Sequence, residues 1–131
     1  MTGPIVYVDT SKVWDGKLEE LTRAMDDLIA FIELNEPDIL AYNVYFKDDG
    51  SIMTVMHMHS SQETLEFHMK VAGPLFAKFT AFLEMQAIDV YGEISDDLVA
   101  RLKTKAETLG SGVVRIHSLY GGLIRGQADG G

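Results

Sequence analysis

Three of the four histidines lie close together in the chain and are the side chains best suited to proton transfer. His57 and His59 belong to a strand-like run, Ile52 to His59, so both point to the same face of the predicted strand. His68 lies in the helical segment that follows. Because imidazole titrates near neutrality, a histidine in an apolar cavity could take a phenolic or enolic proton and leave an anion able to react with oxygen. We therefore predict His68, His57 and His59 as catalytic residues, with His68 or His57 as the base.

Two other interpretations of the same histidines stay open at the level of sequence. His57 and His59 can sit at the end of a strand, near Ser60, and His68 can be a hydrogen-bonded histidine under a helix, because buried polar groups are normally satisfied by their neighbours. The His-x-His spacing also suits a metal site. Its third ligand would have to be His68, His117 or a carboxylate, and the sequence identifies none of them, so we expect no metal.

Residues with hydrogen-bonding or adaptable apolar side chains are candidates for binding a substrate. Strand tyrosines and an asparagine could orient it by hydrogen bonds, although such tyrosines more often pack with the hydroxyl at the surface. The methionines suggest an adaptable apolar cavity, although methionine is also routine core filling. The predicted substrate-binding residues are Tyr42, Asn43, Tyr91, Met56 and Phe76.

The elements that must position these residues alternate between strands and helices. Apolar residues at three- and four-residue steps predict an amphipathic helix that Pro37 ends, and Asp49-Gly50 between two strands predicts a β-hairpin. The predicted core elements are a strand at 5–8, a helix at 17–34, strands at 39–46 and 52–59, a second helix that starts after residues 60–61, and a strand at 87–91. Gly73-Pro74 interrupts the second helix, so we expect a bend or two short helices there. This order predicts an α+β domain with a ferredoxin-like antiparallel sheet and helices on one face.

The remaining residues predict an addition to this core. Ser95 is suited to cap a helix that Gly110 ends, and residues 113–120 predict a fifth strand. Residues 126–131 have too little apolar surface to bury and predict a loose tail. We therefore expect one domain at residues 1–125, with a core at 5–91 and a C-terminal helix and strand at 95–124.

Composition narrows the classes of partner and the compartment. The formal net charge of −9 repels phosphate backbones and anionic lipid surfaces, so we expect neither nucleic acid nor membrane as a partner. The absence of cysteine excludes disulfides and thiolate metal sites. With no basic, apolar leader at the N-terminus and no run long enough to span a bilayer, we expect a cytoplasmic protein.

Several short motifs together resemble the antibiotic-biosynthesis-monooxygenase type of dimeric α+β barrel. The motifs are Gly16-Lys17-Leu18-Glu19-Glu20, then Asn35-Glu36-Pro37-Asp38-Ile39-Leu40-Ala41-Tyr42, then Leu65-Glu66-Phe67-His68, and Gly73-Pro74-Leu75-Phe76. The resemblance covers roughly residues 5–91, and the last forty have no counterpart in the basic pattern. The chain departs from it at His57 and His59, where the family usually has an acidic residue and a Trp.

The resemblance implies two ferredoxin-like subunits that pair their sheets into a barrel, each with a small apolar cavity between sheet and helices. A homodimer is expected independently, because strands 39–46 and 52–58 carry apolar residues on both faces. Haem-cleaving relatives bind iron through a histidine late in the second helix, and residues 76–80 contain none, so we expect no cofactor.

Members of this family differ in chemistry, so fold does not give function. The first hypothesis is a cofactor-independent oxygenase-like enzyme that acts on a small aromatic or enolisable molecule. The alternative is a non-catalytic small-molecule-binding or stress-associated barrel. A water-accessible pocket with converging polar groups favours the enzyme, whereas a filled core favours the alternative.

Overall fold

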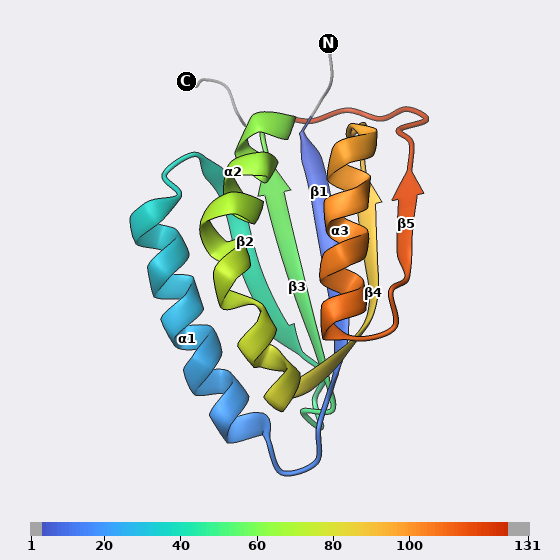
Figure 1. Ribbon diagram of the computed structural model, residues 1–131. Coiled ribbons are helices and arrows are strands. Elements are labelled where there is room, and N and C mark those ends of the chain that lie inside the picture. The colour runs from blue at the N-terminus through green and yellow to red at the C-terminus, as the bar shows by residue number, and fades with distance from the viewer. Residues whose placement is uncertain (1–3, 126–131) are drawn as a thin grey trace.

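A computed structural model describes residues 4–125 of the chain as one sheet covered on one face by helices (Figure 1). The tail predicted at residues 126–131 lies outside this range. The elements are β1 (Ile5–Val13), α1 (Leu18–Asn35), β2 (Ile39–Phe46), β3 (Ile52–His59), α2 (Gln62–Ala72), the short 3-10 helices η1 (Gly73–Leu75) and η2 (Ala77–Ala81), β4 (Leu83–Tyr91), α3 (Asp96–Leu109) and β5 (Val114–His117). The described part has no helix that is both long and apolar enough to span a membrane.

The strand order is β2-β3-β1-β4-β5, and the first four strands pair antiparallel in the ferredoxin-like arrangement. This confirms the predicted α+β fold with helices on one face. The sheet as a whole is mixed rather than antiparallel, because β5 pairs with β4 in parallel. Helix α3 connects these two strands and carries the chain back across the sheet, which is the connection that a parallel pair needs.

Strand alternation divides the sheet into two faces. On β1, the side chains of Ile5, Tyr7 and Asp9 are buried beneath the helices, whereas Val6 and Val8 between them are half-buried on the opposite face. The same alternation on β3 buries Met53, Val55, His57 and His59. The register joins Tyr7, His57 and Tyr42 across three strands, which places their side chains on the helix-covered face.

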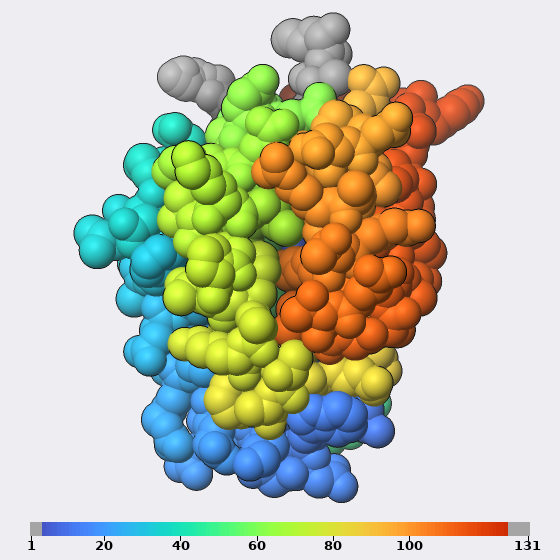
Figure 2. All heavy atoms as spheres, viewed as in Figure 1, coloured from blue at the N-terminus to red at the C-terminus, as the bar shows by residue number. Residues whose placement is uncertain are grey.

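The three α-helices lie side by side over this face, and their side chains close over the sheet (Figure 2). Helix α1 buries a stripe that consists of Leu21, Met25, Leu28 and Ile32. Ser61 and Ser95 cap α2 and α3 by accepting hydrogen bonds from the backbone N–H groups of Thr64 and Leu98. The predicted cap at Ser95 is thus confirmed.

Several predicted boundaries need correction. The hairpin strands have the predicted bounds, but β1 continues to Val13, because its polar residues Asp9 and Ser11 face the interior of the domain. From Gly73 the chain forms two short 3-10 helices, which is one of the two predicted alternatives, but β4 begins at Leu83 instead of residue 87. The fifth strand ends at His117 instead of residue 120, because Leu119 and Tyr120 are exposed beyond the sheet edge.

Candidate active site

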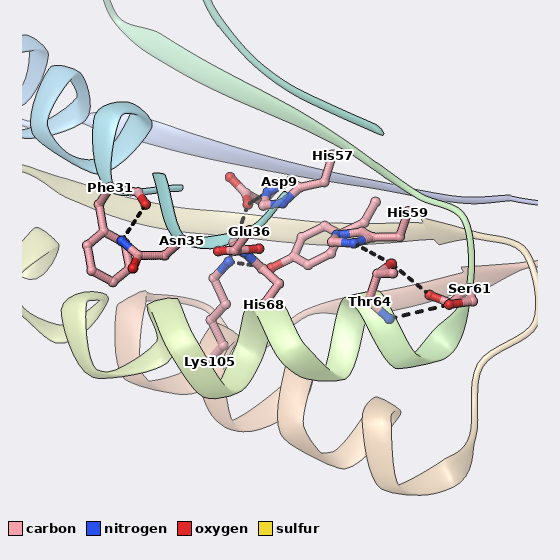
Figure 3. A network of polar contacts seen from close by, with 11 residues as sticks. Asp9, Phe31, Asn35, Glu36, His57, His59, Ser61, Thr64, His68 and Lys105 are labelled. Carbon is pink, nitrogen blue, oxygen red and sulfur yellow. Dashed lines mark hydrogen bonds and ion pairs between the residues drawn. The ribbon is translucent and has the colours of Figure 1, made fainter. Parts of the chain in front are cut away.

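The three predicted histidines form one buried cluster between the sheet and α2 (Figure 3). The ring centroid of His68 lies 5.0 Å from that of His57 and 5.7 Å from that of His59. Strand alternation brings His57 and His59 to the same face, and the buried face of α2 places His68 opposite them. The fold therefore brings together the residues that the sequence singled out for proton transfer.

His68 is oriented by a buried carboxylate. Its Nδ1 atom lies 2.9 Å from each carboxylate oxygen of Glu36, the residue that follows the last turn of α1. Because a carboxylate oxygen accepts, the N–H group at Nδ1 donates the hydrogen bond to Glu36. In a neutral ring the Nε2 atom is then an acceptor, and it is buried without a hydrogen-bond partner in the described structure. An imidazole that is hydrogen-bonded to a carboxylate through one nitrogen, and whose second nitrogen is free, can act as a general base.

His57 belongs to a second charged group. Its Nε2 atom lies 3.4 Å from Asp9 Oδ2, and the same oxygen lies 3.5 Å from Nζ of Lys105 on α3. Lys105 also donates a hydrogen bond to the hydroxyl of Tyr7, whose ring stacks on His57 at a centroid distance of 4.1 Å. Residues from β1, β3 and α3 thus meet in one polar cluster beneath the helices.

His59 is held by a short hydrogen-bonded chain at the start of α2. The hydroxyl of Thr64 donates to the backbone oxygen of Ser61, so it accepts from Nδ1 of His59 at 3.1 Å. Its Nε2 atom is left without a partner within the described residues, as is Nδ1 of His57. Each histidine of the cluster therefore has one buried ring nitrogen without a hydrogen-bond partner among the described residues.

Burial and neighbouring charges shift the pKa values of several groups in the cluster. Burial lowers the pKa of His57 and of His59 to about 3, so both are neutral near pH 7. Burial raises the pKa of the Asp9 carboxyl, but the Lys105 charge and the His57 hydrogen bond outweigh it, and the net pKa is lowered. Burial lowers the pKa of Lys105 against the opposing charge of Asp9, and it raises the pKa of Tyr7 and of Tyr42.

A small cavity of about 30 Å³ adjoins the cluster. Its polar lining consists of Asp9, Tyr42 and Lys105, and its apolar lining consists of Met25, Leu28, Met53, Val55, Phe76, Phe79, Leu83, Met85 and Leu109. A space of this size holds about one or two water molecules, so a larger ligand requires the side chains to move. Methionine side chains adapt readily to such a change.

The structure divides the predicted substrate-binding residues between two faces. Tyr42 and Phe76 contact the histidine cluster, with ring centroids 4.6 Å from His57 and 5.9 Å from His68, respectively. Asn43, Met56 and Tyr91 lie on the opposite face of the sheet, as their register positions beside Val8 and Val6 require. The five predicted substrate-binding residues therefore do not share one face of the sheet, because residues one position apart on a strand point to opposite faces.

The described part of the chain offers no third ligand for a metal site at His57 and His59. Within residues 4–125, no group of three or more His, Cys, Asp or Glu side chains is placed to hold a metal ion. His117 lies on β5, where its Nε2 atom is 2.8 Å from Asp89 on the face opposite the cluster. It cannot complete a site with His57 and His59.

Sequence reasoning missed the charged partners Asp9, Glu36 and Lys105. Two of them had a recognisable signal: Asp9 alternates with Ile5 and Tyr7, and Lys105 lies on the apolar stripe of its helix, three residues after Leu102. Glu36 lies in a turn before a proline, where a carboxylate is ordinarily exposed. Its burial depends on α2 packing above it, which no local pattern records.

Comparison with solved structures finds several proteins with a similar fold. MupZ from Pseudomonas fluorescens is similar at a TM-score of 0.73, with 15% sequence identity over 94% of this chain and 95% of that one. SnoaB, a cofactor-independent oxygenase from Streptomyces nogalater, has a TM-score of 0.59 and 11% identity over 71% of this chain and 95% of its own. A candidate antibiotic biosynthesis monooxygenase from Nitrosomonas europaea has a TM-score of 0.61 and 13% identity over 73% of this chain and 95% of its own.

The likeness to MupZ covers nearly the whole of both chains, so a solved structure has a counterpart for the C-terminal addition that the basic family pattern lacks. No protein-family model and no curated protein sequence matches the chain. At these identities the likeness concerns the fold alone. The chain therefore has the fold of the antibiotic-biosynthesis-monooxygenase type of α+β protein, and the α+β fold that the sequence resemblance implies is confirmed.

Proposed function

We propose that this protein is a cofactor-independent, oxygenase-like enzyme that removes a proton from a small aromatic or enolisable molecule. The observation that carries the proposal is the buried Glu36–His68 pair, in which Nε2 of His68 has no partner among the described residues. Phe76, whose ring centroid lies 5.9 Å from that of His68, lines the nearby cavity. A neutral imidazole held by a carboxylate is a competent base, and Glu36 stabilises the imidazolium that forms when the proton arrives.

The proposed step leaves the electron pair of the broken bond on the substrate. A phenolic or enolic proton, or one from an activated methylene carbon, goes to Nε2 of His68, and the substrate becomes an anion. Molecular oxygen is the oxidant: a methylene group and O₂ give a carbonyl group and water, and His68 returns its proton during this reaction. SnoaB supports the proposal because it is a cofactor-independent oxygenase with the same fold, although one fold hosts many chemistries.

A second function is supported by the size of the cavity. A space of about 30 Å³ lined largely by Met, Leu and Phe side chains is close to a filled core. This favours a non-catalytic barrel protein that binds a small molecule or none. Three histidines each have a buried nitrogen atom with no protein partner, and this supports the enzyme, because buried polar atoms normally have a hydrogen-bond partner and a polar ligand would supply one.

We also propose that the protein acts as a cytoplasmic homodimer. The sheet face turned away from the helices carries Val6, Val8, Met56 and Met58 side by side across β1 and β3. In the domain alone these side chains are only half-buried. A second copy that pairs its own sheet with this face would remove them from water.

Anthrone, an enolisable aromatic ketone, allows proton abstraction and the complete oxygenase reaction to be measured separately. Under anaerobic conditions in D₂O, exchange of its methylene protons followed by NMR reports proton abstraction alone. In air, oxygen uptake with formation of anthraquinone reports the complete reaction. We expect the wild-type protein to accelerate both.

The variants identify the base. His68→Gln is expected to slow the anaerobic exchange about 100-fold or more, because a positioned general base contributes roughly that much. Glu36→Gln is expected to slow it about 10- to 100-fold through lost orientation of the ring. His117→Gln is the matched control on the other face and should leave the rate unchanged. Saturable anthrone binding without exchange would support the non-catalytic function instead.

A further inference from the structure

Lys105 is a buried cation that the proposed proton transfer does not use. It lies on α3, within the apolar stripe formed by Leu98, Leu102, Ala106 and Leu109, and it is only 7% exposed. Lysine side chains on a surface helix ordinarily extend their ammonium into water. Lys105 instead directs it inward, toward the polar cluster beneath the helices (Figure 3).

The contacts of the ammonium leave it able to bind one more oxygen atom. It donates to the Tyr7 hydroxyl, pairs with Asp9 at 3.5 Å, and lies 4.2 Å from the ring centroid of Phe76. An ammonium has three donors, so these two oxygen partners leave one donor free. Lys105 also lines the cavity that adjoins the histidine cluster, where a third acceptor has room to approach.

A purely structural role explains this arrangement poorly. A buried ion pair loses hydration of both charges, and apolar residues of similar volume commonly stabilise a core as well or better. The position on α3 already belongs to an apolar stripe, so a leucine or methionine would fit the pattern of the helix. The charge is better explained by a ligand.

We infer that the Lys105 ammonium binds the carbonyl or phenolic oxygen of the ligand in this cavity and stabilises the negative charge that this oxygen gains when its proton leaves. The inference rests on the proposed proton transfer to His68. Phe76 lines the cavity and lies near both side chains, with its ring centroid 5.9 Å from that of His68 and 4.2 Å from Nζ of Lys105. Helix α3 thus completes the site.

Charge balance identifies the class of ligand. Lys105 and Asp9 neutralise one another, and His57 and His59 are neutral, so the cavity has no uncompensated positive charge among the described residues. A neutral ligand can transfer its proton to His68 without changing the total charge of the site. A carboxylate or phosphate would bring an unpaired negative charge beside Asp9 and Glu36, which is costly in a buried site. We therefore infer a neutral ketone or phenol.

The ionisation of bound 4-nitrophenol tests this inference directly, because its phenolate form is coloured. The wild-type protein is expected to bind it saturably and to lower its pKa below that of the free phenol. Because Lys105→Met alone would leave Asp9 as an unpaired buried charge, the variant to use is Asp9→Asn with Lys105→Met, which removes both charges together. Lys103→Met, an exposed lysine on the same helix, is the control.

We expect the double variant to reduce the acid dissociation constant of the bound phenol at least tenfold relative to wild type, and Lys103→Met to leave it unchanged. An unchanged constant in a folded double variant would overturn the inference, as would the absence of saturable binding by the wild-type protein. The anthrone exchange of His68→Gln is a separate readout. Suppose that His68→Gln loses the exchange, whereas the double variant leaves the acid dissociation constant of the bound phenol unchanged. Lys105 is then not the oxygen-binding group, and His68 remains the proposed base.

Discussion

His68 and Glu36 form the pair on which the proposed chemistry depends, and both are almost fully removed from water. Burial makes a hydrogen bond between them stronger and makes any unpaired polar atom costly. The unpaired nitrogen atoms of His57, His59 and His68 therefore favour a ligand that can donate hydrogen bonds to them. A phenol or an enol can do so with its own hydroxyl group.

The neutral histidines predict a strong dependence of stability on pH. The pKa of His57 and His59 is about 3 in the folded protein and near 6.5 when unfolded, so the unfolded state binds more protons between these values. Stability is therefore greatest above pH 6.5 and falls as pH decreases toward 3. From pH 7 to pH 5, the free energy of unfolding is expected to decrease by about 4 kcal/mol for the two residues together.

Urea unfolding at a series of pH values measures this loss. Replacing both residues with asparagine, His57→Asn with His59→Asn, removes the titrating groups and should flatten the profile between pH 7 and pH 5. A wild-type profile that is already flat in this range would mean that the two histidines are charged or solvated in the folded protein.

At the scale of elements, some strand boundaries follow from the local sequence pattern, and others depend on tertiary packing. The hairpin β2–β3 is predictable to the residue, because strand composition and a turn with Asp49-Gly50 are local signals. Strand β1 is predicted too short, because Asp9, Thr10 and Ser11 resemble polar turn residues. Two of these three are buried by helices from distant parts of the chain, and this burial cannot be seen in the strand itself.

The same distinction applies to the site. The histidines are recognisable by residue type, whereas their roles depend on Glu36, Asp9 and Lys105, which come from three other parts of the chain. Sequence spacing can indicate that Lys105 interrupts an apolar stripe. It cannot indicate that the stripe packs over Asp9, because the position of α3 on the sheet follows from the parallel pairing of β4 and β5.

Gly110 follows α3 at a point where the backbone lies very close to Met85 of β4. We therefore expect its substitution to cause a severe packing defect. A Cβ atom at Gly110 would lie 2.6 Å from the backbone nitrogen of Met85 and closer still to its backbone oxygen, and neither can move without disturbing the ladder. We expect Gly110→Ala to lower the free energy of unfolding by about 3 kcal/mol or more.

Gly73→Ala is the matched control, because a Cβ atom added at Gly73 would have nothing within 4 Å and the backbone there is already helical. It should be neutral or raise stability by about 0.5 kcal/mol. Thermal and urea unfolding compare the two variants. Equal stability of Gly110→Ala and wild type would show that α3 is not docked on β4 as described.

At the scale of the whole molecule, the uncovered face of the sheet predicts self-association. Val8 and Met56 are direct partners at its centre, and both are apolar. In sedimentation at micromolar concentration, we expect twice the chain mass of 14.5 kDa. Val8→Asp with Met56→Asp should shift the protein toward the monomer, since like charges would face one another across the interface.

Leu34→Asp is the control for this experiment, because Leu34 is exposed on α1 at the helical surface of the molecule. It should leave the dimer intact. A wild-type protein that sediments as a monomer would contradict the proposed homodimer, and the apolar face would then need another partner.

The tautomer of His68 is the measurement that tests the central claim most directly. Long-range ¹H–¹⁵N correlation by NMR distinguishes a protonated from a bare imidazole nitrogen. We expect the His68 proton on Nδ1 and a bare Nε2 near pH 7, with loss of this preference in Glu36→Gln. A proton found on Nε2 in the wild-type protein would leave His68 without a free acceptor, and it would contradict its proposed role as the base.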